Sequence, residues 1–211
     1  MTIIHSGDYM NRMVKNRGFT IVELVVVIAI IGVLSLILVP TLFGAVADSR
    51  IASANQAAKE LRDRAQEFLT IMDTQNTPMT GGDTTLKITA KDGWWRLAGG
   101  NGAADWQDGV DHWNTQERVQ APAYVPMRGS EMLSYMADSL YSMYDAYIEI
   151  HCSGGRVLGV SVIPGADSAV GVMPVAQDFV SGYFSFGDSE RAGMVGNTVV
   201  GTSPVLILPR P

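Results

Sequence analysis

An uncharged apolar run from residue 24 to residue 47 constrains this chain more than any other feature of its sequence. About 20 apolar residues are enough for an α-helix to cross a bilayer, so the run predicts one transmembrane helix. Arg12, Lys15 and Arg17 precede the run, and Asp48 is the first charged residue after it. Because basic residues favour the cytoplasmic side, the pattern predicts a cytoplasmic N-terminal segment and a head outside the membrane.

A single acid, Glu23, stands at the start of this run. A lone carboxylate in a membrane segment costs roughly 2.5–3.5 kcal/mol at a helix centre, and less near an end. Such a residue is generally retained because it has a partner. The arrangement therefore favours a membrane-inserted, self-assembling subunit over an enzyme.

Residues 18–24 read Gly-Phe-Thr-Ile-Val-Glu-Leu and are followed by the apolar run. This stretch resembles the N-terminal signature of type IV pilins and type II secretion pseudopilins, and the resemblance extends over about residues 12–45. It implies that a prepilin peptidase/methyltransferase cuts between Gly18 and Phe19 and then methylates the new amino group of Phe19. Residues 1–18 are then a cytoplasmic leader that is removed.

The resemblance also implies three residues that act in assembly, namely Glu23, Gly32 and Pro40. We interpret Glu23 as a register element, because its carboxylate can pair with the ammonium of Phe19 in its own chain or in a neighbour. Proline removes one backbone hydrogen bond from a helix. In related filaments the helix between the corresponding glycine and proline loses regular structure on assembly, and we expect the same here.

The implied function is that of a structural subunit of a type IV pilus or a type II secretion-like pseudopilus, with no enzymatic activity. Its implied partners are the prepilin peptidase, other pilin or pseudopilin subunits, an inner-membrane assembly platform and the lipid bilayer. The expected location is a single-pass membrane protein that becomes part of an extracellular or periplasmic filament. The residues leave open whether this filament is a pilus, a secretion pseudopilus or a DNA-uptake device.

Other interpretations of the N-terminal segment also remain open. Ala45-Val46-Ala47 resembles a signal peptidase site, so the chain could be a secreted binding protein cut after Ala47, with a Trp-rich loop that holds a ligand. An uncleaved anchor that tethers a binding protein or an enzyme is the other alternative. Neither alternative gives Glu23 a role, and the apolar run exceeds the 7–15 residues usual for a secretory signal.

Residues 48–72 continue the helical pattern beyond the membrane. Apolar residues recur at the spacing of one helical face, namely at Ile51, Ala54, Ala58, Leu61, Ala65, Phe68 and Met72. We therefore expect one helix over residues 19–72, with a transmembrane half (19–47) and an amphipathic half (48–72) that packs under a head.

Residues 73–211 are expected to form this globular head. The apolar spacing over 130–144 predicts a short helix with Ser130 as its N-cap. Alternation over 147–152 and 156–163, around Ser153-Gly154-Gly155, predicts a β-hairpin. A further short helix over 174–184 and a last strand over 205–208 complete the expected α+β fold, a pilin-like long N-terminal helix packed on a small antiparallel sheet.

Residues 93–114 contain all four tryptophans of the chain. We expect these rings mostly to pack against the head. Asp105, Asp108 and Asp111 lie among them and are a candidate ligand or calcium loop, although their spacing does not match an EF-hand. No other metal site is expected, because the histidines lie far apart in the sequence.

Charge and cysteine content narrow the function classes further. The net charge is −6, and Asp8 with three basic residues gives the leader +2, so the chain after Gly18 carries −8. Such an acidic chain is a poor match for nucleic acid. Cys152 is the single cysteine, so no internal disulfide can form, and we expect it to be a packing or surface residue. No nucleophile elbow or phosphate-binding glycine loop occurs, and no cofactor is expected.

Overall fold

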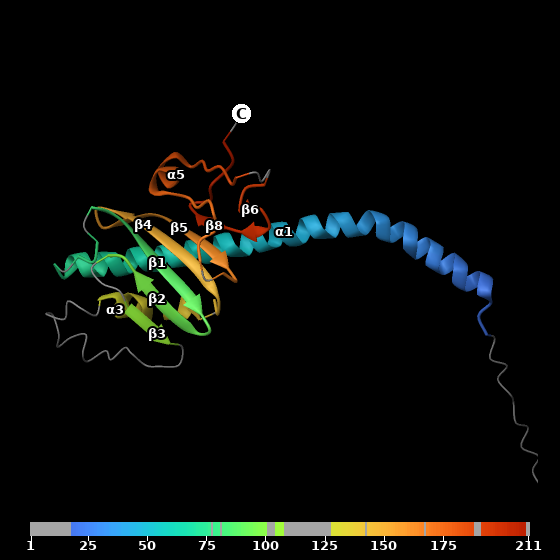
Figure 1. Ribbon diagram of the computed structural model, residues 1–211, viewed down its shortest axis with the longest axis horizontal. Coiled ribbons are helices and arrows are strands. Elements are labelled where there is room, and N and C mark those ends of the chain that lie inside the picture. Colours follow the sequence, from blue (N-terminus) through green and yellow to red (C-terminus); the bar gives the residue numbers. More distant parts are fainter. Residues whose placement is uncertain are drawn as a thin grey trace, which may run out of the picture. The chain divides into compact units, whose positions relative to one another are not determined.

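The computed structural model describes residues 18–76, 78–80, 82–100, 104–107, 128–141, 143–166, 168–187 and 191–209. The chain divides into two compact units, Met1–Ala45 and Val46–Pro211. The element order is α1, β1, β2, β3, α3, α4, β4, β5, α5, β6, β7 and β8 (Figure 1). This arrangement confirms the expected α+β class, in which a long N-terminal helix packs on a small antiparallel sheet.

Helix α1 (Ile21–Thr74) is 54 residues long and contains Pro40. One continuous helix was predicted over residues 19–72, and this prediction is confirmed. In the second unit, one face of α1 is buried at nearly the predicted positions. Small alanines alternate with larger side chains along this face. Its buried residues are Ala54, Ala58, Leu61, Ala65, Phe68, Leu69 and Met72.

The head is built on a sheet of six antiparallel strands in the order β3-β2-β1-β4-β5-β8. The strands are β1 (Asp83–Lys91), β2 (Trp94–Ala98), β3 (Ala104–Gln107), β4 (Ala146–Ser153), β5 (Arg156–Pro164) and β8 (Gly201–Ser203). The predicted hairpin is confirmed as β4 and β5, which turn at Gly154 and Gly155, both with positive φ. Strands β6 (Met194–Val195) and β7 (Thr198–Val199) form a separate two-stranded hairpin.

The two faces of the sheet bury different clusters. Ile148, Ile150 and Cys152 of β4 belong to the core that includes the buried face of α1. Tyr147 belongs to a second cluster with Phe179 and other residues of the C-terminal segment. Since β4 side chains alternate between faces, the strand is covered on both sides.

Three expectations for the head need correction. The prediction of one helix over residues 130–144 is wrong, because the chain forms two helices there, α3 (Arg128–Tyr135) and α4 (Ala137–Leu140), with Met136 between them. Ser130 is therefore inside α3 and is not an N-cap. The expected apolar face is nevertheless correct, since Leu133, Met136 and Leu140 are fully buried.

The last strand is also displaced from its expected position at 205–208. The strand that pairs with β5 is β8, and Ile207 makes only an isolated bridge with Tyr183. The expected short helix over 174–184 is present as α5 (Ala176–Ser181). Its C-terminus is capped by Gly182, whose φ of 79° suits a residue without a side chain.

The Trp-rich stretch begins as sheet and not as a loop, because its first part forms β2 and β3. Trp95 is 1% exposed, as expected for a packing residue, whereas Trp94 is 49% exposed. Asp105 lies on β3 opposite Arg96 of β2. Asp108 and Asp111 lie outside the described residues.

Candidate processing and assembly site

The proposed cleavage point lies just before the first turn of α1. Gly18, Phe19 and Thr20 are exposed and non-helical, and the helix begins at Ile21. Phe19 is 85% exposed, and no described atom lies within 4 Å of a Cβ built on Gly18. The peptide bond between Gly18 and Phe19 is therefore outside the helical hydrogen-bond ladder and accessible.

Thr20 and Glu23 close the N-terminus of α1 with reciprocal hydrogen bonds. The backbone N–H of Thr20 donates to Glu23 Oε2 at 2.8 Å, and the Thr20 hydroxyl donates to the same oxygen at 2.9 Å. The backbone N–H of Glu23 donates in turn to Thr20 Oγ1 at 3.2 Å. This is a capping box, in which a threonine N-cap and a glutamate three residues later satisfy N–H groups that a helix start leaves unpaired.

The capping box gives Glu23 a partner within its own chain, which the sequence analysis missed. The Thr-x-x-Glu spacing over residues 20–23 was the available signal. Both bonds from Thr20 reach Oε2, and Oε1 has no hydrogen-bond partner among the described residues. A carboxylate has about four acceptor positions, so Glu23 can cap its helix and still accept another donor.

The apolar side chains of the first part of α1 are exposed along its length. Exposed fractions include 57% for Ile28, 77% for Leu36 and 72% for Phe43. An apolar surface of this extent marks contact with lipid or with other protein. By length and composition, α1 is able to cross a membrane once.

Gly32 and Pro40 lie within regular helix in this structure. A Cβ built on Gly32 would meet no described atom within 4 Å. Near Pro40, the hydroxyls of Ser35 and Thr41 donate to the carbonyls of Ile31 and Leu38 at 2.8 and 2.9 Å. The loss of helical structure between Gly32 and Pro40 on assembly stays a prediction.

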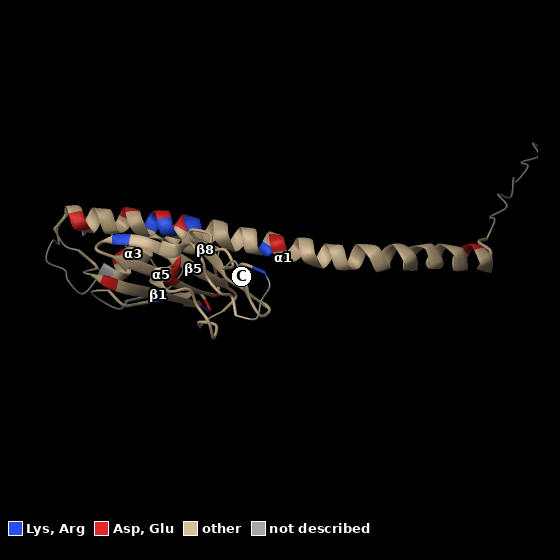
Figure 2. Ribbon diagram, turned by 90° about the horizontal axis from the view of Figure 1, so that it is seen from above, with Lys and Arg blue, Asp and Glu red and all other residues tan. Residues whose placement is uncertain are grey.

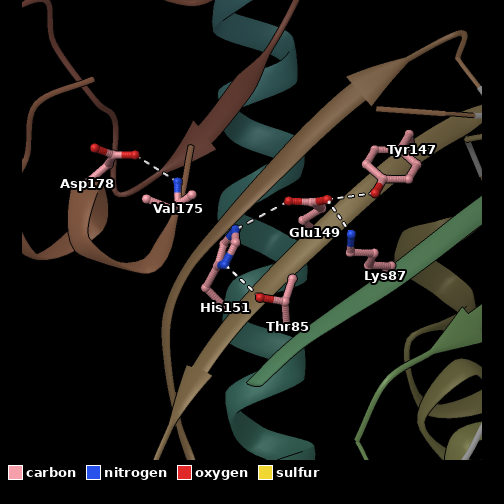
Figure 3. A network of polar contacts seen from close by, with 7 residues as sticks. All are labelled: Thr85, Lys87, Tyr147, Glu149, His151, Val175 and Asp178. Atoms are coloured by element: carbon pink, nitrogen blue, oxygen red, sulfur yellow. Dashed lines mark hydrogen bonds and ion pairs between the residues drawn. The ribbon is translucent and has the colours of Figure 1, made fainter. Parts of the chain in front are cut away.

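The head contains a separate buried polar cluster on the sheet face away from α1 (Figure 3). Glu149 Oε1 accepts a hydrogen bond from the Tyr147 hydroxyl at 2.6 Å and lies 3.5 Å from Lys87 Nζ. The other oxygen, Oε2, lies 3.6 Å from Nε2 of His151. Nδ1 of His151 lies 3.1 Å from the hydroxyl of Thr85.

Burial shifts the pKa of two members of this cluster, His151 and Tyr147. It lowers the pKa of His151, and the nearby Glu149 carboxylate only partly opposes this effect. Burial and the bond to Glu149 both raise the pKa of Tyr147. The neutral tautomer with a proton on Nε2 suits the facing carboxylate, and it leaves Nδ1 to accept from Thr85.

The cluster joins β1 and β4 to the segment that covers them. The ring of Phe179 on α5 lies 5.4 Å from that of His151, and a Cβ on Gly159 of β5 would overlap the Phe179 ring. We interpret the cluster as a structural link between the sheet and α5. Sequence alternation placed Tyr147, Glu149 and His151 on one face but did not indicate that this face is covered.

Two family models match the chain. One, described as a domain of unknown function (DUF5021), matches residues 51–207, most of the chain. The chain belongs to this DUF5021 family. The other, the prokaryotic N-terminal methylation motif, matches residues 13–39 of this DUF5021 protein and identifies a type IV pilin-like prepilin signal. Neither the curated proteins nor the solved structures gave a match.

The motif and the capped apolar helix together support a coarse functional assignment. They indicate that this DUF5021 protein is a pilin- or pseudopilin-type substrate of a prepilin peptidase and is anchored in a membrane. They also point to a structural role. Within the described part of the chain, no group of three or more His, Cys, Asp or Glu residues is placed to hold a metal ion.

Proposed function

We propose that this protein is a prepilin-like subunit that is cleaved between Gly18 and Phe19, is methylated on Phe19, and assembles into a pilus or a type II secretion-like pseudopilus. In this proposal residues 19–47 anchor the subunit in the membrane, and the head of residues 73–211 lies outside. An assembly platform in the membrane receives the subunit, and the apolar part of α1 packs against the same part of other subunits.

The observation that carries this proposal is the match to the N-terminal methylation motif over residues 13–39. The geometry supports it in two ways. The bond proposed for cleavage is exposed and non-helical, so a peptidase can reach it without first unwinding a helix. The apolar side chains of α1 that follow have no cover within the described residues of their own unit.

Glu23 is proposed to align an incoming subunit by accepting a bond from the amino group of Phe19. Oε1 supports this role, because it has no hydrogen-bond partner among the described residues and remains an acceptor while the capping box is intact. The attraction between the Glu23 carboxylate and the Phe19 ammonium is partly offset by the cost of removing both charges from water.

The test separates the charge of Glu23 from its capping role. Glu23→Gln retains a side-chain oxygen that can close the capping box, because Gln also serves at this position. We expect cleavage at Gly18 to continue in this variant and filament formation to fail. The matched variant Thr20→Val removes the hydroxyl, which costs about 0.5–2 kcal/mol of helix stability, but keeps the carboxylate.

N-terminal sequencing and mass measurement of the membrane and sheared-surface fractions give the readout. A chain that starts at methylated Phe19, with filaments formed by Thr20→Val and not by Glu23→Gln, is the expected result. Normal filaments from Glu23→Gln would remove the proposed role of its charge. A chain that starts at Asp48 would instead indicate secretion after Ala47.

A further inference from the structure

An open groove lies in the second unit between α1 and the C-terminal segment. Its volume is about 670 Å³, within the range of sites that accept a small molecule or a few side chains. Arg50, Ser53 and Ala57 of α1 form one wall. Asn197 and Thr198, at the tip of the β6–β7 hairpin, form another.

Among the described residues that line the groove, Arg50 alone is charged. Arg50 is exposed, and it has no ion-pair partner among the described residues. None of the described residues that line the groove is acidic. The nearest acid in the sequence, Asp48, is held by Arg191 at 2.7 Å. Ser53, Asn197 and Thr198 add neutral polar groups to a lining that is otherwise apolar, so Arg50 is the group in the groove that can pair with a carboxylate.

A second copy of this chain is an acidic partner of this kind. Residues after Gly18 carry a net charge of −8. Arg50 is also the first basic residue after the apolar run, on the same helix. Figure 2, which colours the ribbon by residue charge, shows an uncharged stretch of α1 followed by a charged one. If the apolar runs of neighbouring copies pack together, then another copy lies beside α1 where the groove begins.

We propose that this groove receives a carboxylate-bearing segment of an adjacent copy, with Arg50 as the pairing cation. The inference rests on the proposed assembly function. It adds a second, polar contact in the head to the apolar contact in the helix. Such a contact would fix how one head is turned against the next, because charge complementarity selects orientation more than it adds affinity.

Photo-cross-linking of the full-length protein in host membranes tests this directly. Asn197→p-benzoylphenylalanine places the probe at the groove, where Asn197 is exposed. Mixing isotopically labelled and unlabelled copies separates contacts between copies from contacts within one chain. We expect a cross-link to a second copy, on a peptide that contains Asp or Glu.

Paired variants show whether the cross-link between copies depends on the groove itself. Arg50→Glu should reduce the cross-link about fivefold or more, whereas Lys59→Glu, an exposed charge on α1 outside the groove, should leave it unchanged. Arg50→Lys should retain it. Ser53→Trp should block the groove, and Ala52→Trp, on an exposed neighbour that does not line it, should not.

A second probe distinguishes failure of this inference from failure of the proposed function. Leu36→p-benzoylphenylalanine reports on the apolar segment, where Leu36 is 77% exposed. Cross-links between copies at residue 36 but none at residue 197 would overturn the proposed groove contact. Equal effects of each variant and its control on the cross-link at residue 197 would also overturn it. A cross-link from 197 to lipid or to another protein would also overturn it. Absence of cross-links between copies at both positions would overturn self-assembly and the groove together.

Discussion

The close contact between Gly201 and α1 gives the sharpest prediction about the stability of the head. Gly201 opens β8, and its backbone lies directly against Ala54 of α1. A Cβ built on Gly201 would overlap the backbone carbonyl of Ala54 and would lie 2.6 Å from the Ala54 Cβ. Ordinary contacts begin at 3.4 Å and the overlap with the carbonyl is the closer of the two, so the strand and the helix would have to separate by about 1.1 Å.

Neither element can move away freely. Val162 of β5 pairs with Gly201, and the N–H of Thr202 donates to Asn55 Oδ1 of α1 at 2.7 Å. Overpacking of this kind costs about 1–3 kcal/mol. If the separation also breaks the bond to Asn55, the buried N–H of Thr202 is left unpaired, at a further cost of about 1–3 kcal/mol. We therefore expect Gly201→Ala to lower the free energy of unfolding by about 1–3 kcal/mol, or by about 2–6 kcal/mol if the bond to Asn55 is lost.

Urea unfolding of the full-length protein in detergent, followed by tryptophan fluorescence, measures this change because Trp95 is buried. Gly171→Ala is the matched control, since Gly171 is exposed, has open space around it and has no positive φ. The control should be neutral or slightly stabilising. Equal unfolding midpoints for Gly201→Ala and Gly171→Ala would show that β8 does not press on α1 as described.

Two further predictions concern buried groups of the head. Because burial lowers the pKa of His151 below its ordinary 6.5, the unfolded chain takes up a proton first as the pH falls, so stability is complete above about pH 6.5 and declines below it. His151→Gln should flatten this decline in urea titrations at stepped pH, and identical pH slopes for both proteins would contradict it. Burial also raises the pKa of Cys152 to about 12, and the residue is 1% exposed, so iodoacetamide at mildly alkaline pH should label it only after unfolding. Rapid labelling of the folded protein would show that this part of the core opens.

Local patterns in the sequence were enough to predict helix α1 and the β4–β5 hairpin. The apolar spacing from Ile51 to Met72 identified the buried face of α1, because that face packs along a single sheet. The Gly154-Gly155 turn fixed the β4–β5 hairpin. In both cases the signal lies within a short stretch of chain and does not depend on what packs from elsewhere.

Strand β1 was missed even though its apolar residues alternate. Leu86, Ile88 and Ala90 are fully buried, while the polar residues Lys87 and Thr89 lie between them. The glycine-rich flanks gave the stretch the composition of a loop, and its polar positions weakened the apolar signal. The alternation itself was present and was sufficient evidence for a strand.

The polar cluster and the position of the last strand depend on contacts between distant segments. Alternation along β4 predicted one buried and one exposed face, but Tyr147, Glu149 and His151 are covered by the C-terminal segment. The Val-Leu-Ile-Leu stretch at 205–208 reads as a strand, yet the ladder forms at Gly201–Ser203. Small residues permit the close approach to α1 there, which strand propensity does not measure.

The capping box changes how the charge on Glu23 is understood. All three bonds between Thr20 and Glu23 lie on the C-terminal side of the Gly18–Phe19 bond, so cleavage leaves them intact. Cleavage does add a positive charge near a helix N-terminus, where the helix dipole is unfavourable to cations. Oε1 of Glu23, which has no hydrogen-bond partner in the described part of the chain, would offset this in the proposed function, whether the amino group belongs to the same chain or to a neighbour. In the proposed function, capping and assembly would use different oxygens of one carboxylate, and removing the charge while keeping the acceptor would separate the two roles.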